Sequence, residues 1–405
     1  MRKLRSLAAA ALVCALAVPA AAQSTGAVRI GILNDMSGIY SDFQGPGSVV
    51  AAQMAVEDFG GKVNGQPIEV IGADHQNKTD VGVSIAREWL DKGGVNAIVD
   101  VPNSAIALAV NDIVRQHNSV FLVTGGGTDL LTGEKCSPNT VQWVYDTWAD
   151  ANSIARLGVR SGGKSWFFIT ADYAFGYALE KQAMRAVTEE GGTVVGSVRV
   201  PLGAMDVSSF ILQAQASKAD VIALASAGGD VTNAIKTAKE FGVMSGGQKM
   251  VALIFQIENV QSLGLETAQG IETVNPFYWD MNERTRAFST RFRERDRKHA
   301  VPNEMHAGVY SAVIHYLKAV QAVGSAADGA AVVKKMKELP TSDPLYGEGT
   351  VREDGRKMHP MYLIRVKSPA ESKGEWDYYK IRTSIPAEEA FRPLSEGNCP
   401  LVAKK

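Results

Sequence analysis

The sequence predicts an α/β protein with two lobes, each built on a parallel β-sheet that helices cover on both faces. Short β-branched runs alternate with amphipathic helical stretches from residue 28 onward, a pattern typical of parallel sheets. The alternation starts again near residue 166, which indicates a second lobe. The chain has 405 residues, of which 45% are hydrophobic, and this is enough material for more than one core.

The first set of elements lies between residues 28 and 124. Strands are predicted at 28–33, 68–73, 95–101 and 120–124. Helices are predicted at 48–59, at 79–89 and at 104–117. Gly60-Gly61 ends the first helix, and Asn64-Gly65 forms the turn into the second strand.

The second set of elements repeats this order. Strands are predicted at 166–170, 193–200, 221–226 and 250–255, and helices near 174–190, 207–217 and 230–241. Two long helices, 283–299 and 304–323, and a shorter one that ends at 339 follow, and residues 345–382 are strand-like. No Gly/Ser-rich or Pro-rich linker separates the two sets, so we expect the lobes to touch.

The first 22 residues have the features of a secretory signal peptide. Residues 2–5 supply positive charge, an apolar stretch follows at 7–18, and small residues up to Ala22 offer a cleavage site. We therefore exclude residues 1–22 from the fold and expect an exported protein cleaved near Ala22. A lipoprotein cleaved at Cys14 is the alternative.

Export leaves two cysteines, Cys136 and Cys399, in an oxidising compartment where disulfides persist. We predict that they pair, because each lies in a short loop near a proline. The bond would tie the C-terminal tail to the first half of the chain. Two unrelated buried thiols are the alternative.

Composition and motifs exclude several classes of function. Lys plus Arg number 42 and Asp plus Glu number 43, so the chain has no excess positive charge for nucleic acid. The sequence contains no G-x-G-x-x-G, no G-x-S-x-G and no H-E-x-x-H motif. His306 and His315 are expected to be structural residues. We expect no cofactor, no metal and no catalytic residue, although an exported hydrolase stays open.

Candidate binding residues follow the predicted strands. Asn103-Ser104 and residues 125–128 and 227–230 come directly after strands and open helices or turns. Ligands of parallel sheets bind outside the carboxyl ends of strands, where free backbone N–H groups attract a carboxylate. Helix capping by Ser104 and Asp230 is an equally good interpretation, and the two roles can coexist.

Several stretches resemble the leucine/isoleucine/valine-binding proteins. They are residues 30–38 with Met36-Ser37-Gly38, residues 51–61, residues 64–69, residues 170–176 and residues 218–222. The resemblance covers nearly the whole mature chain. It implies a periplasmic solute receptor of the type I architecture, in which two α/β lobes joined by three crossings deliver a solute to the permease of an ABC importer.

This resemblance also implies how the chain divides. Residues 27–145 plus 275–340 would form the N-terminal lobe, and residues 146–274 plus 341–399 the C-terminal lobe. A monomer is expected. The same fold serves as the sensing half of receptors and gene regulators, so a ligand-sensing module is the alternative function.

The resemblance implies a set of ligand-lining residues as well. They are Phe43, Ser104, Gly126, Thr128 and Phe175, and we add Tyr173 and Asp230 as further candidate ligand-binding residues. In relatives, the equivalents of Ser104, Gly126 and Thr128 hold the ligand carboxylate. We therefore expect a small carboxylate solute, gripped by closure of the two lobes.

The second lobe departs from the pattern of the relatives. Phe175 stands where relatives have Tyr, Ala227 replaces another aromatic residue, and Phe255-Gln256 stands where amino-acid binders place a Glu for the ammonium group. The nearest carboxylates are Asp230 and Glu258. An aromatic carboxylate and a branched-chain amino acid both stay open, and the missing acid favours the first. Relatives also have a disulfide at the positions of Asn77 and Asn103.

Overall fold

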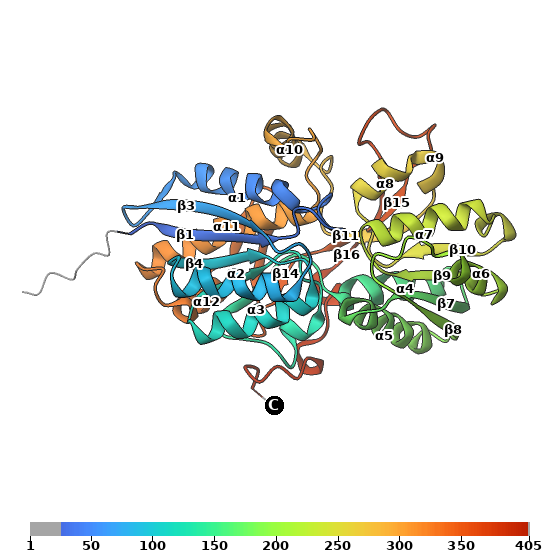
Figure 1. Ribbon diagram of the computed structural model, residues 1–405, viewed down its shortest axis with the longest axis horizontal. Coiled ribbons are helices and arrows are strands. Elements are labelled where there is room, and N and C mark those ends of the chain that lie inside the picture. The colour runs from blue at the N-terminus through green and yellow to red at the C-terminus, as the bar shows by residue number, and fades with distance from the viewer. Residues whose placement is uncertain (1–25, 404–405) are drawn as a thin grey trace, which may run out of the picture.

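The computed structural model describes residues 26–403, and the predicted signal peptide and Cys14 lie outside them. Two α/β lobes lie side by side, one built mainly from the first third of the chain and the other mainly from the middle (Figure 1). Each lobe has a parallel sheet as its centre, so the predicted fold class is confirmed. Among residues 26–403, no helix combines the length and the apolar character that a membrane crossing requires.

The first lobe contains a six-stranded sheet in the order β2-β3-β1-β4-β5-β6. All pairs in it are parallel except β2 with β3. The strands are β1 (Val28–Asn34), β2 (Lys62–Val63), β3 (Gln66–Asp74), β4 (Val95–Asp100), β5 (Val120–Val123) and β6 (Thr140–Gln142). β4 and β5 are almost wholly buried, because helices cover both sides of the sheet.

The helices of the first lobe come from two distant parts of the sequence. They are α1 (Gly45–Phe59), α2 (Thr79–Asp91), α3 (Ser104–Gln116), η1 (Asp129–Thr132), α10 (Glu283–Arg295), α11 (Glu304–Val323) and α12 (Gly329–Glu338). α1 and α11 pack on one face of the sheet, and α2 and α3 pack on the other. α11 is buried along most of its length, which explains its nearly continuous apolar sequence.

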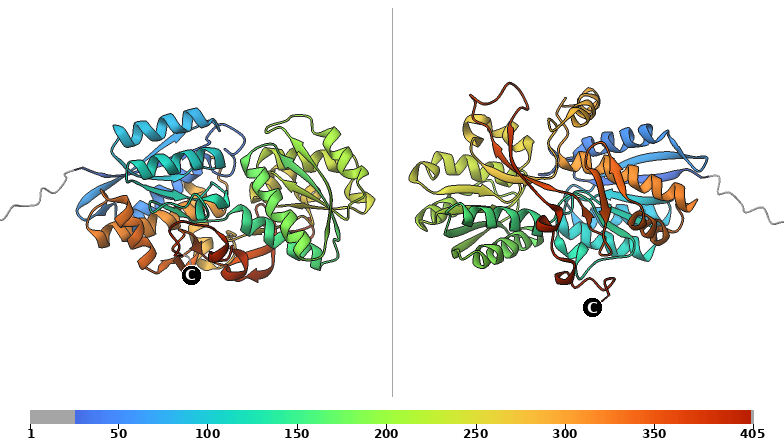
Figure 2. Two further views of the ribbon diagram at one scale, coloured as in Figure 1. Left: turned by 90° about the horizontal axis from the view of Figure 1, so that it is seen from below. Right: turned by 180° about the vertical axis from the view of Figure 1, so that it is seen from behind.

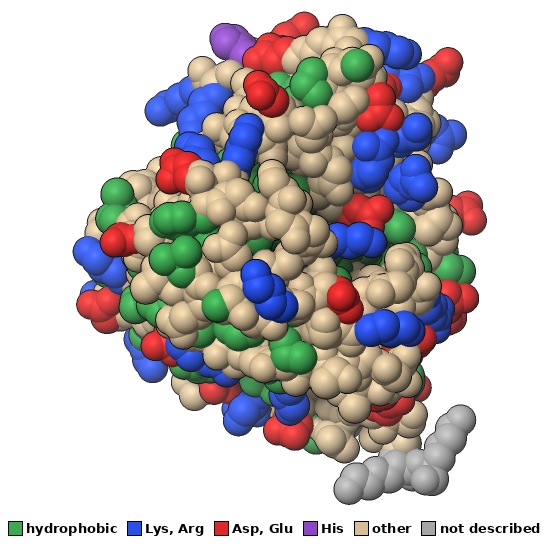
Figure 3. All heavy atoms as spheres, turned by 90° about the vertical axis from the view of Figure 1, so that its right-hand side faces the viewer, with side chains coloured by type: hydrophobic (Ala, Val, Ile, Leu, Met, Phe, Trp, Pro, Cys, Tyr) green, Lys and Arg blue, Asp and Glu red, His purple; other side chains and the backbone are tan. Residues whose placement is uncertain are grey.

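The second lobe has a four-stranded parallel sheet in the order β10-β9-β7-β8. Its strands are β7 (Ser165–Ala171), β8 (Thr193–Val200), β9 (Val221–Ala225) and β10 (Lys249–Ala252). Its helices are α4 (Thr147–Arg160), α5 (Ala174–Glu189), α6 (Ser208–Ala216), α7 (Gly229–Glu240), η2 (Met244–Gly246), α8 (Ile257–Leu263) and α9 (Leu265–Ala268). The sequence pattern did not predict α4, which is capped by the side chain of Asp146. Acidic and basic side chains are interspersed over the outer end of this lobe (Figure 3).

A third sheet connects the lobes. Its antiparallel strands are β11 (Glu272–Asn275), β15 (Met361–Val366) and β16 (Tyr379–Ile385). Within residues 26–403 the chain passes between the lobes after β6, after β11 and before β15, and the tail after β16 returns beneath the first lobe (Figure 2).

The predicted division assigns residues 341–399 to the C-terminal lobe, but one segment of them lies on the first lobe. The rest of the predicted division stays a prediction. The small antiparallel sheet of β12 (Thr341–Asp343), β13 (Gly347–Val351) and β14 (Lys357–Met358) packs on α11 and α12 of the first lobe. Two hydrogen bonds hold it there. The Ser311 hydroxyl of α11 donates to Asp343 over 2.7 Å, and the Lys318 ammonium donates to the Ser342 carbonyl over 2.8 Å.

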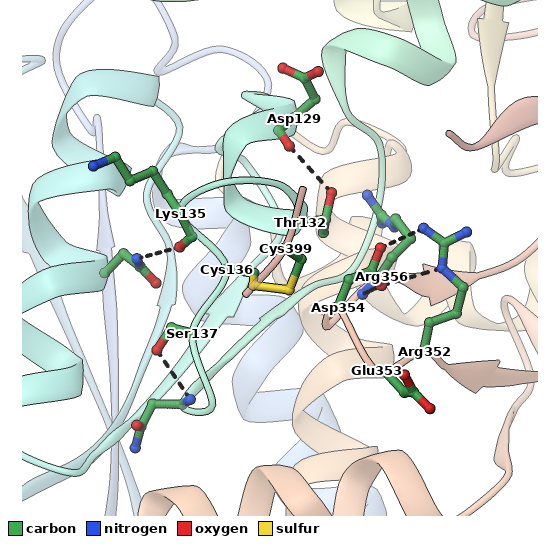
Figure 4. Close-up of a disulfide and its surroundings, with 12 residues drawn as sticks. Asp129, Thr132, Lys135, Cys136, Ser137, Arg352, Glu353, Asp354, Arg356 and Cys399 are labelled. Carbon is green, nitrogen blue, oxygen red and sulfur yellow. Dashed lines mark hydrogen bonds and ion pairs between the residues drawn. A yellow bond between two sulfur atoms is a disulfide. The ribbon is translucent and has the colours of Figure 1, made fainter. Parts of the chain in front are cut away.

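The predicted disulfide between Cys136 and Cys399 is present (Figure 4). The tail also contains α13 (Ala387–Ala390) and η3 (Leu394–Glu396). Just before the bond, the Arg392 guanidinium donates to Asp129 Oδ2 over 2.9 Å and to the Asp129 carbonyl over 2.8 Å. Gln182 of α5 donates to the same carboxylate. The tail therefore fixes the start of η1 next to the second lobe.

Candidate functional site

Ser104 lies in the first turn of α3, next to the carboxyl end of β4. The side chain of Asn103, not that of Ser104, caps this helix, because Asn103 Oδ1 accepts from the N–H groups of Ala105 (2.9 Å) and Ile106 (3.2 Å). The capping interpretation of Ser104 is therefore wrong. Its hydroxyl is fully buried and has no hydrogen-bond partner among residues 26–403, and it lies where the helix dipole favours an anion.

Asn103 has a second role at the same place. Its amide nitrogen donates to Asn77 Oδ1 over 2.7 Å. The resemblance places a disulfide of the relatives at these two positions, and here a side-chain hydrogen bond joins them instead. The bond holds the start of α3 against the loop that precedes α2.

The turn at residues 125–128 follows β5 and adjoins the start of α3. A Cβ on Gly126 would stand 2.9 Å from the Ala107 Cβ and 3.0 Å from the Val101 carbonyl, so only glycine allows this close packing. Gln142 donates to the carbonyls of Gly126 (2.9 Å) and Thr128 (3.1 Å). Within residues 26–403, the backbone N–H groups of 126–128 take no hydrogen-bond partner, so they are free to bind an acceptor.

Thr128 has a local partner already. Its hydroxyl accepts from the Leu130 N–H over 3.4 Å and caps η1. Its backbone N–H and its hydroxyl hydrogen stay free to donate to a ligand.

The end of β4 holds a strained and buried backbone. Asp100 and Val101 have φ angles of 86° and 59°, which are rare for a carboxylate residue and more so for a β-branched one. The Asp100 carboxyl accepts from Asn34 and from Thr124, each over 3.0 Å, and burial raises its pKa. These bonds fix the strand end that leads through Pro102 to Ser104.

Aromatic side chains from both lobes meet in front of this edge. A small pocket there is lined by Tyr40, Phe43, Pro102, Tyr145, Tyr173, Phe175 and Ala227. The Tyr40 and Tyr173 hydroxyls hydrogen-bond across the boundary between the lobes, and burial raises the pKa of both phenols. No charged side chain lines the pocket. Its volume of about 10 Å³ is room for about one water molecule, so a solute enters only when the lobes or rings move apart.

Two glycines allow the lobes to come this close. A Cβ on Gly127 of the first lobe would stand 2.5 Å from the Phe175 ring of the second. A Cβ on Gly228 of the second lobe would stand 2.6 Å from the Ile39 carbonyl and 3.0 Å from the Phe43 ring. We call this arrangement the closed form.

A larger cavity of about 310 Å³ adjoins the aromatic pocket and shares Phe43 with it. The polar and charged side chains that line it are Asp42, Asp230, Thr232, Asn233, Lys236, Glu258, Asn259 and Ser262. Asp230 does not cap α7 through its side chain; both of its carboxylate oxygens accept from the Gly203 N–H, over 3.1 and 3.2 Å. Burial raises the pKa of Asp230.

The structure therefore brings together most of the predicted site residues. Phe43, Tyr173 and Phe175 line one pocket, whose edge leads to Ser104, Gly126 and Thr128. Asp230 lies in the neighbouring cavity instead. Sequence reasoning missed Tyr40 and Tyr145; the only signal for Tyr40 was its place in the same loop as Phe43.

The two helix histidines are buried and bonded to backbone. His306 contacts the Gln44 carbonyl over 3.0 Å, and His315 contacts the Met336 carbonyl over 2.8 Å. Burial lowers the pKa of each to about 4, so both are neutral near pH 7. Among residues 26–403, no His, Cys, Asp or Glu side chains are grouped so that they could hold a metal ion.

Comparison with known proteins adds independent evidence. A sequence model of the periplasmic binding protein family matches residues 27–375. A periplasmic binding protein structure from Burkholderia mallei superimposes with a TM-score of 0.89 at 48% identity, covering 93% of this chain and 99% of that one.

A second solved structure and a curated relative are also similar to this chain. A branched chain amino acid ABC transporter periplasmic ligand-binding protein from Burkholderia xenovorans LB400 gives a TM-score of 0.83 at 42% identity, covering 92% of this chain and 99% of that one. The Leu/Ile/Val-binding protein homolog 6 of Brucella melitensis is 26% identical over 89% of this chain and 92% of its own length.

Proposed function

This chain belongs to the periplasmic binding protein family, and on that premise we propose that it is the periplasmic solute receptor of an ABC importer. It would capture a small apolar or aromatic carboxylate between its lobes and hand it to a membrane permease. The observation that carries the proposal is the aromatic pocket, which takes side chains from both lobes at the carboxyl ends of β4 and β5. Parallel α/β folds place their ligand sites at such an edge.

The first lobe is suited to hold the carboxylate. The Ser104 hydroxyl is buried without a partner, and the N–H groups of 126–128 are free. Hydrogen bonds to a carboxylate are charge-assisted and therefore stronger than neutral ones. The positive end of the α3 dipole adds to the attraction.

The second lobe is suited to select an apolar ring. Tyr173 and Phe175 face Tyr40 and Phe43 across the boundary, and aromatic rings gain from offset or edge contacts. The apolar part of a solute whose carboxylate is held on the first lobe would pack against these rings. Closure makes and breaks no covalent bond; the difference in affinity between open and closed forms supplies the driving force.

A branched-chain amino acid is the second candidate, and one observation favours it. Asp230 and Glu258 line the cavity beside the aromatic pocket, where an ammonium group could reach them. Burying an ammonium without such a partner would cost several kcal/mol.

A thermal-shift screen of the mature chain tests the proposal. The probes are benzoate, phenylacetate, butyrate, leucine and valine. A solute that binds only the folded chain raises its Tm, so we expect a rise with benzoate or phenylacetate. A rise with leucine and valine alone would support the second candidate. No rise with any probe, or chemical turnover of a bound one, would contradict the receptor.

A further inference from the structure

Two side-chain hydrogen bonds cross the boundary between the lobes in opposite directions. Gln256, which precedes α8 in the second lobe, donates its amide to Glu304 Oε1 of α11 over 2.7 Å. Asn303, which precedes α11 in the first lobe, donates its amide to Glu258 Oε1 of α8 over 2.9 Å. Each helix start thus gives an amide and receives one. We call these two bonds the interlobe amide–carboxyl pair.

Both carboxyl groups of this pair are buried and only half satisfied. Glu258 and Glu304 are exposed over 8% and 2% of their surface. Their other oxygens, Glu258 Oε2 and Glu304 Oε2, are buried and have no hydrogen-bond partner among residues 26–403. Ionisation would bury a negative charge in a group of which one oxygen has no hydrogen-bond donor, and this is unfavourable, whereas a neutral acid carries no such charge.

Few positive charges lie near enough to favour ionisation. The titratable or charged groups around the pair, from each element packed against it, are Asp42, Tyr145, Asp150, Asp230, Lys236, Tyr278, His306, Tyr346 and Tyr379. Lys236 is the one cation among them and lines the cavity on α7. Arg356 interacts electrostatically with Asp150 and Tyr346 and forms an ion pair with Asp146. His306 is neutral.

Resting on the proposed receptor function, we propose that the interlobe amide–carboxyl pair is a proton-dependent latch, so that closure of the lobes takes up protons. In the closed form Glu258 and Glu304 are neutral acids held by Asn303 and Gln256. When the lobes separate, water reaches both groups and they ionise. Closure is therefore favoured in acidic solution and weakened in alkaline solution.

The sign and the window follow from proton linkage. Burial raises the pKa of Glu258 and of Glu304 to about 8 in the closed form, and their mutual repulsion adds to the rise for Glu258. In water a Glu side chain has a pKa of about 4.3. The latch is thus fully effective below about pH 4.3, loses effect as the pH rises, and reaches its minimum above about pH 8. The open-to-closed ratio changes by up to about tenfold per pH unit for each carboxyl.

Distance measurement between the lobes tests the latch without any solute. Spin labels at Arg87→Cys on α2 and Glu240→Cys on α7, both exposed, report the separation of the lobes by pulsed EPR from about pH 5 to about pH 9. We expect the short-distance population to fall as the pH rises. The double variant Glu258→Gln, Glu304→Gln, whose amides imitate neutral acids, should lose this dependence.

Controls separate the latch from other effects. Glu180→Gln removes a buried carboxyl that pairs with Arg199 inside the second lobe, and it should keep the pH dependence of the parent. If the double variant does not fold, Glu258→Gln alone should still lower the slope by about half. A parent distance that does not change with pH, or a double variant that keeps the full change, overturns the latch. Such a result would not contradict the proposed receptor function, which the thermal-shift screen of solutes tests separately.

Discussion

The two faces of the interlobe site are built in different ways. At the ends of β4 and β5 the first lobe offers backbone and small groups, held by capping and by the bonds of Asp100, and the rings of Tyr40 and Phe43 lie beside them. The second-lobe face consists of large side chains that start from helix ends, namely Tyr173, Phe175, Asp230 and Glu258.

This difference indicates a division of labour. Backbone N–H groups and one hydroxyl recognise a carboxylate and are indifferent to what carries it. Rings and acids of the second lobe contact the rest of the solute. Substitutions of the first-lobe groups at the ends of β4 and β5 should therefore weaken the binding of every carboxylate solute about equally, and substitutions on the second lobe should change which solute binds.

The largest effect on stability is expected from the disulfide, which helps to keep the first-lobe face in place. The disulfide closes a loop over a sequence separation of 263, and the double variant Cys136→Ser, Cys399→Ser should lose about 5 kcal/mol of unfolding free energy. Denaturant unfolding measures it. Because Arg392 still holds Asp129, benzoate affinity should change by less than about 0.5 kcal/mol. A large loss of benzoate affinity would show that the C-terminal tail contributes to the first-lobe binding face.

A methyl group placed between the faces should have the next largest effect. Gly228→Ala puts a Cβ 2.6 Å from the Ile39 carbonyl of the other lobe at a φ of 62°, so closure should be disfavoured by about 2–3 kcal/mol. Calorimetry should then show benzoate binding about 30- to 150-fold weaker.

Gly242→Ala is the matched control for this change. Gly242 also has a positive φ, of 67°, but a Cβ there would meet nothing within 4 Å. Its variant should lose some stability and keep its affinity. Equal losses of affinity in both variants would mean that the Gly228 effect is local strain and not a block to closure.

The difference between the two faces also explains which features could be predicted from the sequence. Strand ends and glycines are short-range signals, so the parallel sheets and the positions of Ser104 and Gly126 at the sheet edge could be predicted. Oxidising export and two cysteines predicted the disulfide. The cap at Asn103, the Tyr40–Tyr173 contact and the position of Asp230 depend on where two lobes meet, and no periodicity contains that information. α4 was missed because its buried face includes polar residues such as Asp150 and Asn152.

Ser104→Ala should weaken the first-lobe face by a smaller amount. Loss of one charge-assisted hydrogen bond costs roughly 1–3 kcal/mol. The loss should be about equal for benzoate, phenylacetate and butyrate, measured by calorimetry. Ser153→Ala, which removes another buried hydroxyl without a hydrogen-bond partner among residues 26–403, on α4, is the control and should leave affinity unchanged. Unequal losses among the three acids would contradict the proposed division.

Asp230→Asn should have the smallest effect on an acid without an amine, and this makes it the sharpest probe of the second-lobe face. The amide keeps an oxygen that can accept from the Gly203 N–H, so the fold loses little. Benzoate affinity should change by less than about 0.5 kcal/mol, because no charged partner of Asp230 is removed. Leucine, if it binds at all, should lose roughly 1–3 kcal/mol with its ammonium partner. Calorimetry of both solutes on this one variant thus shows whether Asp230 selects the solute or only holds the loop at Gly203. Equal large losses of affinity for benzoate and leucine would show that Asp230 does not select between them.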